Sequence, residues 1–367
     1  MDTREIVTLP IAPIHKTRLI SAGYKFVGDF TDVDVEQLSR GTGLNHSECE
    51  HLLNFITESK TFVPKSRLGS EIFEKEESDG RIMTFSEKLD EALGGGMQRG
   101  IVTEICGLPG VGKTQLCMQL ACVVQMPEVF GGVEGEAVYI ETDGGLVLER
   151  LTDIVAATVK HCRHIASRDS DPDIQNIVSS MAVDKMLAGI HVYSCHDNSQ
   201  LLGTVELLPE FLKENRKIKV VIIDSVAFHF RHDFDDMSLR TRVLTNLAQT
   251  LIRISKTFDV AVVVTNQMTT RVHQGADKGS HIVPCLGESW GHACTCRVIL
   301  QHENGSRRMW LYKSSSQPQS YTPFQITKEG IRDVAACEPQ ELMNQDYRDN
   351  TETDSSVDNP SKRQRLV

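Results

Sequence analysis

Eight consecutive residues have the types and spacing of a phosphate-binding loop. An apolar run precedes them and a helical pattern follows, the context in which the motif G-x-x-x-x-G-K-[ST] binds nucleotides. Its glycines let backbone N–H groups close around phosphates. Lys113 would reach the β- and γ-phosphates and Thr114 would hold Mg²⁺. We therefore predict ATP and Mg²⁺ as cofactors, bound by Gly107, Leu108, Pro109, Gly110, Val111, Gly112, Lys113 and Thr114.

A carboxylate ends a second apolar segment further along the chain. Asp224 follows the run Val220–Ile223. In nucleotide-binding α/β proteins an aspartate at such a strand end lies beside Mg²⁺. Apolar strands that end in Asp occur in many α/β proteins, so the position after the phosphate-binding loop gives this one its weight. We predict that Asp224 contacts the metal through a water molecule.

Two further strand ends carry candidates for the hydrolysis of ATP. Glu141 and Asp143 follow an apolar segment and would leave the same face if the strand continued. A carboxylate there could orient the attacking water, or the segment could simply cap a strand end. Gln267 ends another apolar run and could contact the γ-phosphate. The predicted catalytic residues are Lys113, Asp143, Glu141 and Gln267.

Basic residues occur in two segments that follow these strand ends. A long segment from residue 268 to about 287 contains Arg271 and Lys278, and a shorter one at 228–233 contains Arg231. We expect both to be loops at the carboxyl edge of the sheet, where open α/β sheets bind ligands. Basic and aromatic side chains on such loops suit single-stranded DNA, although their basic density is modest.

The elements that must position these residues follow from the alternation of apolar patterns between about 82 and 335. Buried strands separated by amphipathic helices indicate an α/β fold with a twisted, mainly parallel sheet. Later strands with short turns should be antiparallel. Expected strands are 101–106, 137–140, 190–193, 220–223, 260–264, 297–301, 309–312 and 324–326, and expected helices are 114–125, 146–159, 201–212 and 239–254.

The remaining segments suggest four parts in the chain. Residues 1–60 read as a small helical domain, 61–80 as a charged linker, 81–337 as the α/β core, and 338–367 as a disordered acidic tail. The apolar pair Ile72 and Phe73 within the linker could dock on a neighbouring subunit or pack on its own domain. The tail ends in a basic cluster that could serve as a nuclear import signal or be a solvated terminus: Lys362, Arg363 and Arg365.

A glycine turn lies between two short helical patterns of the N-terminal segment. The turn reads Arg40-Gly41-Thr42-Gly43. Its exposed N–H groups could meet a DNA phosphate, as in a helix-hairpin-helix unit. A small bundle that needs glycine only for the turn is an equal alternative.

Charge and composition narrow the classes of protein. The chain has 367 residues, with 39 basic against 50 acidic side chains and a net charge of −11. DNA binding must therefore use a local patch. No apolar run is long enough to span a membrane. Ten scattered cysteines indicate buried apolar positions in a reducing compartment, and the spacing of Cys294 and Cys296 does not fit a zinc site.

Several motifs together resemble a known family. They are Leu89-Asp90, Gly94-Gly95-Gly96, the phosphate-binding loop, Thr265-Asn266-Gln267 and His292-Ala293-x-Thr295-x-Arg297. They are similar to the RecA-type recombinases of eukaryotes and archaea over about residues 80–335. Segments 115–120, 231–236 and 286–292 look closer to one of the eukaryotic recombinase paralogues.

This resemblance implies a RecA-type P-loop ATPase core and a DNA-dependent ATPase activity. It implies a role in double-strand break repair by homologous recombination, in complexes with other paralogues that support the recombinase filament on single-stranded DNA. Branched DNA, including Holliday junctions, would be a further substrate. The protein would be located in the nucleus, and the cytoplasm is a second expected location. It also implies that ATP lies at a subunit interface, that Ile72 and Phe73 dock a subunit, and that Arg231 and Arg271 face DNA.

One motif departs from the family pattern. The family usually reads Asp-Thr-Glu-Gly where this chain reads Glu141-Thr142-Asp143-Gly144. The position that orients water therefore falls on Asp143, which is one methylene shorter. We expect slow hydrolysis, and a scaffold that binds ATP without turnover remains an alternative. A small-molecule kinase is disfavoured because no arginine-rich lid follows the phosphate-binding loop.

Overall fold

The computed structural model of the chain divides into two compact units, Met1–Asp79 and Gly80–Val367. Each unit is described by itself. The structure describes residues 4–9, 11–60, 66–78, 80–232, 234, 236–272 and 280–334. The predicted acidic tail, with Lys362, Arg363 and Arg365, lies outside these residues, as does Lys278.

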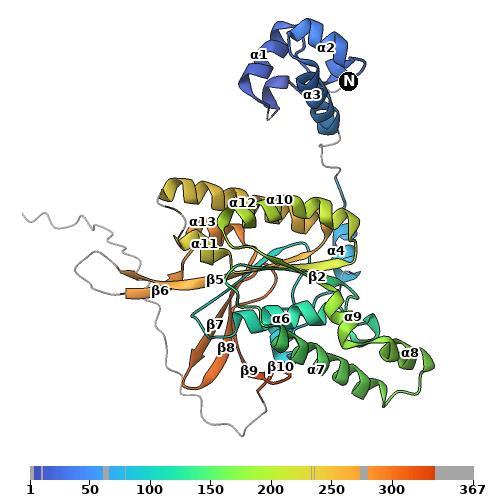
Figure 1. Cartoon of the computed structure of the whole chain (residues 1–367), viewed down its shortest axis with the longest axis vertical. Coiled ribbons are helices and arrows are strands. Elements are labelled where there is room, and N and C mark those ends of the chain that lie inside the picture. The colour runs from blue at the N-terminus through green and yellow to red at the C-terminus, as the bar shows by residue number, and fades with distance from the viewer. Residues whose placement is uncertain are drawn as a thin grey trace, which may run out of the picture. The chain divides into compact units, whose positions relative to one another are not determined.

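The first unit is helical, in keeping with the sequence pattern (Figure 1). A small core of apolar side chains, including Leu19, Phe30 and Leu38, is buried between its helices. The glycine turn ends α2, and Gly43 adopts a left-handed conformation (φ 65°) that favours glycine. Its helices are η1 (Ile6–Thr8), α1 (Pro13–Ser21), η2 (Val27–Phe30), α2 (Val35–Thr42), α3 (His46–Lys60) and α4 (Gly69–Ser78).

The segment predicted as a linker contains a helix. Residues 69–78 form α4 rather than an extended connection. Ile72 and Phe73 lie on it with 43% and 60% of their surface exposed. An exposed apolar pair on a short helix is a feature of docking segments, because a partner can remove it from water.

The second unit is built on a ten-stranded sheet with the order β10-β9-β8-β7-β1-β5-β4-β2-β3, and β6 pairs with β5 outside this path. The six strands from β7 to β3 run parallel, whereas β8, β9, β10 and β6 are antiparallel to their neighbours. The strands are β1 (Val102–Gly107), β2 (Glu136–Glu141), β3 (Ile190–Ser194), β4 (Ile218–Asp224), β5 (Ala261–Val272), β6 (Ser280–Pro284), β7 (Cys296–Glu303), β8 (Ser306–Lys313), β9 (Ser320–Thr327) and β10 (Gly330–Asp333).

Helices cover both faces of this sheet (Figure 1). One face packs against α6, α7 and their neighbours, and the other packs against α10, α12 and α13, so two apolar cores form. The helices are α5 (Glu87–Ala92), α6 (Lys113–Val123), η3 (Glu128–Phe130), α7 (Leu148–Ala166), α8 (Pro172–Ser180), α9 (Val183–Ala188), α10 (Asn198–Glu214), α11 (Val226–His232), α12 (Met237–Phe258) and α13 (Glu288–Ala293). The predicted α/β fold with a mainly parallel sheet is confirmed.

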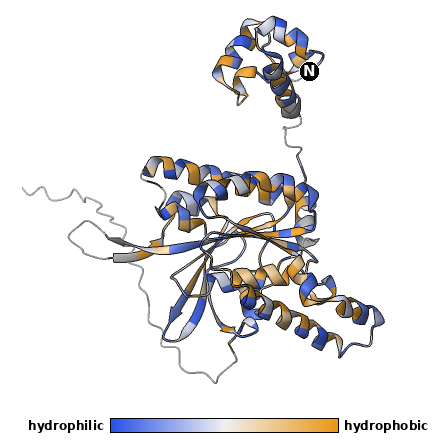
Figure 2. Ribbon diagram, in the orientation of Figure 1, coloured by the Kyte–Doolittle hydropathy of each residue, from blue (hydrophilic) through white to orange (hydrophobic). Residues whose placement is uncertain are grey.

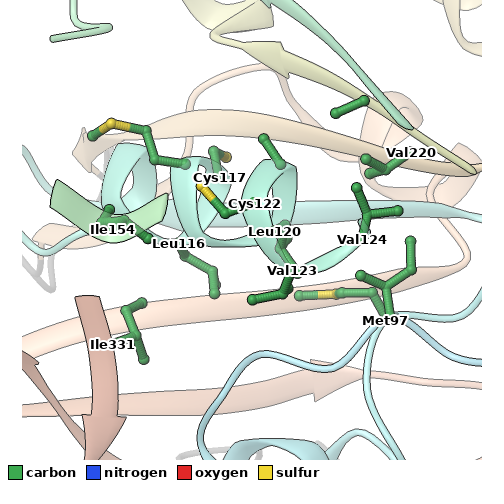
Figure 3. Packing of buried hydrophobic residues seen from close by; sticks show 14 of the residues in the cluster. Met97, Leu116, Cys117, Leu120, Cys122, Val123, Val124, Ile154, Val220 and Ile331 are labelled. Carbon is green, nitrogen blue, oxygen red and sulfur yellow. The ribbon is translucent and has the colours of Figure 1, made fainter. Parts of the chain in front are cut away.

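The helix that follows the phosphate-binding loop is buried along most of its length. From Leu116 to Val123 each residue of α6 is buried, and Figure 2 shows it as hydrophobic. Its side chains pack against β4, α7 and β10 through Val220, Ile154 and Ile331 (Figure 3). Burial of this many apolar side chains fixes the helix, and with it the end of the loop that precedes it.

Two segments expected to be loops are regular elements. The segment 228–233 lies largely within α11, and β5 continues to Val272, well beyond the expected strand end at 264. The chain returns as β6, so 268–272 pair with 280–284 in an antiparallel ribbon that projects from the sheet (Figure 1). Apolar periodicity missed the extension of β5 because it includes polar residues such as Thr269 and Thr270, which are at least partly exposed. It missed α11 because seven residues are too few for a helical period to stand out. Residues 273–279 lie outside the described residues.

Within the described residues no helix is long and apolar enough to cross a membrane. Most of the described cysteines are buried, as expected for small apolar side chains. Burial raises the pKa of several of them, including Cys162 and Cys296, each to about 11. The thiols therefore stay protonated and unreactive at neutral pH.

Candidate nucleotide-binding and catalytic site

The predicted phosphate-binding loop connects the buried strand β1 to the buried helix α6. Gly112 occupies the N-cap of α6 with φ 115°, a conformation that side chains with a Cβ rarely adopt. The Lys113 ammonium donates to the carbonyl oxygens of Gly107 and Leu108 at 3.0 and 3.1 Å. Its charge is therefore held over the loop, where phosphate oxygens would replace the carbonyls as stronger acceptors. Burial lowers the pKa of Lys113, and nearby Asp224 opposes this shift.

Asp224 ends β4 at the same edge of the sheet and is buried. One carboxylate oxygen accepts a hydrogen bond from the Tyr139 hydroxyl at 2.9 Å, and the other accepts one from Thr265. Tyr139 lies on β2 and Thr265 on β5, so strands on both sides orient the carboxylate. Burial and the charge of Asp224 raise the pKa of Tyr139, which keeps that hydroxyl a donor.

Glu141 and Asp143 do not share a face. The strand β2 ends at Glu141, whose carboxylate accepts a hydrogen bond from Ser194 on β3 at 2.7 Å. Asp143 follows in a bend and accepts a hydrogen bond from the Gly145 N–H at 3.1 Å. A Cβ added at Gly145 would lie 3.0 Å from Asp143 Oδ1 and 3.9 Å from Thr114 Oγ1. Asp143 is therefore beside the phosphate-binding loop, whereas Glu141 contacts the neighbouring strand β3.

The environment of Asp143 favours its protonated form. Partial desolvation is the largest cause, and the negative charge of Asp224 adds to it, so the pKa of Asp143 is raised. A hydrogen bond from the Gly145 N–H opposes the shift. A carboxylate with a raised pKa is a better general base than an ordinary one, provided that it is ionised at the working pH.

Gln267 lies on β5, directly beside the residue at which β1 ends and the phosphate-binding loop begins. It pairs with Gly107 in the parallel register of β5 and β1. Its side-chain oxygen accepts a hydrogen bond from the guanidinium of Arg231 on α11. A predicted γ-phosphate contact is therefore bonded directly to a predicted DNA contact.

A buried polar cluster that the sequence analysis did not identify lies beneath this edge. Glu104 on β1 is fully buried and accepts hydrogen bonds from Asn266 Nδ2 at 2.7 Å and Trp290 Nε1 at 3.0 Å. Arg297 on β7 donates from Nε to the same carboxylate at 2.6 Å. The cluster joins β1, β5, β7 and α13. Its signals in the sequence are a glutamate within a mainly apolar strand and two motif residues, Asn266 and Arg297, which nothing in the sequence joins to it.

The residues present fit a nucleotide with Mg²⁺. Thr114 and Asp224 offer hard oxygen ligands, and Mg²⁺ commonly takes one or two such groups together with substrate phosphates and water. Among the described residues no group of three or more His, Cys, Asp or Glu side chains could hold a metal by itself. A metal at this edge would thus depend on phosphate oxygens to complete its coordination.

Comparison with known proteins identifies the family. A family model described as Rad51 matches residues 77–334, which is most of the chain. The chain belongs to the Rad51 family. The prediction of a RecA-type recombinase relative is confirmed by this match.

Individual relatives match this chain over most of its length. The chain is 43% identical to "DNA repair protein RAD51 homolog 3" of Cricetulus griseus over 342 residues, 90% of this chain and 93% of that protein. The protein of the same description from Dictyostelium discoideum is 37% identical over 270 residues, 74% and 70% of the two chains. "DNA repair and recombination protein RadA" of Aeropyrum pernix is 31% identical over 337 residues, 90% and 98% of the two. The expected resemblance to one of the eukaryotic recombinase paralogues is confirmed by the two proteins described as RAD51 homolog 3.

The predicted DNA contacts of this Rad51 family member differ in where the structure places them. Arg231 is exposed on α11. Arg271 lies in the ribbon, where its backbone pairs with that of His281. Lys278 lies outside the described residues, and Arg271 stands four positions along β5 beyond Gln267, the partner of Arg231.

Proposed function

We propose that this chain is an ATP- and Mg²⁺-dependent DNA-binding protein with DNA-dependent ATPase activity. It would act in double-strand break repair by homologous recombination. The observation that carries the proposal is the pairing of Gln267 with Gly107, together with the hydrogen bond from Arg231 to Gln267. These contacts connect the nucleotide-binding edge to a side chain suited to DNA phosphate. The relatives named for DNA repair support this reading.

The phosphate-binding loop would hold ATP through its backbone N–H groups and the N-terminus of α6. Lys113 would exchange its carbonyl partners for phosphate oxygens. Thr114 would bind Mg²⁺ directly, and Asp224 would do so through water. The metal supplies positive charge that stabilises the transferring phosphoryl group.

Asp143 would orient the attacking water because it lies beside Thr114 at the loop. Its side chain is short, and Gly145 already engages one of its oxygens. Gln267 would contact the γ-phosphate region from the other side. Glu141, bonded to Ser194, would support the loop geometry rather than touch the reacting atoms. Slow hydrolysis follows from a carboxylate held about one methylene too far from its task.

Other recombinase paralogues are the proposed partners, in a hetero-oligomer that supports the recombinase filament on single-stranded DNA. Ile72 and Phe73 on α4 provide an exposed apolar pair for such docking. Branched DNA such as Holliday junctions is a further proposed substrate. DNA phosphates would be contacted by Arg231, Arg271 and Lys278. The basic residues Lys362, Arg363 and Arg365 would direct the protein to the nucleus.

The deciding experiment measures ATP hydrolysis and binding to single-stranded DNA by the full chain, alone and co-expressed with paralogues, with Lys113→Ala as the control. We expect nucleotide-dependent DNA binding and slow, DNA-stimulated hydrolysis that Lys113→Ala removes. DNA binding that falls with rising salt would show phosphate contacts. No nucleotide binding in either preparation would refute the proposal.

A second candidate is a scaffold that binds ATP as a structural ligand without turnover. The hydrogen bond from Gly145 to the short Asp143 favours it. Binding to the native state alone stabilises an assembly. The two candidates differ in one result: in the scaffold, Lys113→Ala abolishes association with the paralogues, whereas in the ATPase it abolishes turnover and leaves association in place.

A further inference from the structure

The contact between Arg231 and Gln267 joins a long, flexible side chain to a residue whose backbone is held in the sheet. Arg231 is an exposed, flexible side chain near the C-terminal end of α11. The backbone of Gln267 is held on both sides, because it pairs with Gly107 of β1 and its carbonyl accepts from the Cys285 N–H at 2.9 Å. Any change at this contact must therefore take place in the side chains.

The residue before Gln267 strengthens this restraint. Asn266 is fully buried, donates to Glu104, and accepts a hydrogen bond from Cys285 Sγ at 3.0 Å. Both strands of the ribbon are therefore tied to the core of the sheet at their base. The side chain of Gln267 extends from a rigid position and can exchange partners without movement of the strand.

We propose that Arg231 restrains Gln267 when DNA is absent and that a DNA phosphate releases it. In the structure the amide oxygen of Gln267 accepts from the cationic Arg231, which holds the amide in one orientation and makes its oxygen a weaker acceptor for the attacking water. Withdrawal of Arg231 onto a phosphate would free that oxygen, while the amide nitrogen could donate to the γ-phosphate. This inference rests on the proposed function, because it assigns the source of DNA-dependent hydrolysis at the same site.

Physical chemistry favours the exchange in this direction. The amide oxygen of Gln267 is neutral, whereas a phosphodiester group is charged and its two non-bridging oxygens can accept two parallel bonds from a guanidinium. Arg231 is exposed, so the exchange requires little new desolvation. The phosphate is therefore the better partner, and the exchange should weaken as salt screens it.

The exchange also has a reciprocal consequence. If DNA binding releases Arg231 from Gln267, then the contact opposes DNA binding, and loss of Gln267 must favour DNA binding by the free energy of that contact. This gives a readout that does not depend on turnover. Arg231 acts on hydrolysis through Gln267 and is therefore a positioning residue for the reaction.

The first test compares Arg231→Ala with the unchanged chain in the paralogue complex, with and without single-stranded DNA. We expect DNA-free hydrolysis to rise about threefold or more and the further stimulation by DNA to be largely lost. Arg253→Ala, which removes another exposed arginine from α12, serves as the matched control and should change neither rate. An unchanged or lower DNA-free rate in Arg231→Ala would overturn the inference.

The second test measures single-stranded DNA affinity at several salt concentrations. Gln267→Ala should bind about threefold more tightly than the unchanged chain, because Arg231 is then free. In the Arg231→Ala background the same change should have no effect, as a double-mutant cycle requires for a pair that acts through direct contact. Equal affinities of Gln267→Ala and the unchanged chain would contradict the exchange.

The outcomes separate this inference from the proposed function. Absence of nucleotide binding and hydrolysis in the unchanged complex defeats the proposed function. Hydrolysis that depends on Lys113 and responds to DNA, but ignores Arg231, keeps the proposed function and defeats only the exchange. If hydrolysis is too slow to measure, the affinity cycle alone decides.

Discussion

Two neighbouring strands, β1 and β5, pass the same edge of the sheet, and each positions a predicted site residue there by different means. At the end of β1 the backbone itself forms the site, with Gly112 in a left-handed conformation and Lys113 bonded to loop carbonyls. At the corresponding point β5 does not end, and Gln267 lies in the middle of a strand that continues to Val272. The first site is made by local geometry, whereas the second depends on contacts with distant parts of the chain.

This difference has a functional meaning. A loop formed by its own backbone is ready to bind an anion without rearrangement. The side chain of Gln267, in contrast, has a partner in Arg231 that a ligand can take away. A preorganised binding site beside an exchangeable contact is suited to an ATPase whose turnover depends on a second ligand.

Loss of Glu104 should have the largest effect, because the Glu104 carboxylate holds β5 at this edge of the sheet through its hydrogen bond from Asn266. Glu104→Ala leaves the Arg297 guanidinium buried beside Asn266 and Trp290 without its carboxylate. Breaking a buried ion pair by removing one partner costs about 3–5 kcal/mol. Denaturant unfolding should show this loss of stability.

The control for Glu104 is Glu303→Ala, which breaks the exposed ion pair with Arg308. That change should cost less than about 1 kcal/mol. A Glu104→Ala variant as stable as the control would mean that β5 does not need the Glu104 carboxylate to hold it at this edge.

Lys113→Ala tests the β1 end. It should lower the rate of hydrolysis by about 10²–10³-fold, because a charged donor aimed at the transferring phosphate is lost. The free energy of unfolding without nucleotide should change little, since Lys113 bonds only to carbonyls of its own loop. Single-turnover hydrolysis and nucleotide-free unfolding measure the two. Marked destabilisation would show that the loop is not held by its backbone alone.

Asp90, which belongs to neither of these two sites, should make the stability of the chain depend on pH. Burial raises the pKa of Asp90 to about 6, against a partial opposing effect of its hydrogen bond from the Thr84 N–H. The folded chain therefore holds a proton that the unfolded chain releases near pH 4. Stability from this group is present below about pH 4 and is lost as pH rises through about 6.

Asp90→Asn should remove this background while keeping an oxygen that can accept from Thr84. Relative to the variant, the unchanged chain should lose about 2–3 kcal/mol of unfolding free energy between pH 4 and pH 7. Unfolding curves at several pH values measure the difference. Parallel pH profiles of the two proteins would refute the assignment, and the measured profile is the baseline for pH effects at either strand end.

Asp143→Glu should have the smallest effect. Lengthening the side chain by one methylene should raise DNA-stimulated hydrolysis about tenfold, equal to about 1.4 kcal/mol. The acid limb of the unchanged enzyme should lie above that of an ordinary carboxylate, because the pKa of Asp143 is raised. Asp173→Glu, an exposed aspartate on α8, is the matched control. Unchanged single-turnover hydrolysis would show that the short side chain does not limit the rate.

Much of the site was predictable because its chemistry is local in the sequence. The phosphate-binding loop needs adjacent glycines, a lysine and a threonine, and the strand that ends at Asp224 is a continuous apolar run. The parallel sheet follows from the alternation of such runs with helices. The α11 helix and the extension of β5 were not predictable, because their residues carry no strong apolar period.

The sequence by itself determined the phosphate-binding loop, the α/β fold and the family, because each depends on the types and order of nearby residues. Only the tertiary structure decided that Glu141 bonds to Ser194 while Asp143 lies beside Thr114. It alone brought Glu104, Asn266, Trp290 and Arg297 into one cluster, and Arg231 onto Gln267. The physical reason is that polar partners in a folded chain are chosen by strand register and helix packing, which join residues far apart in sequence.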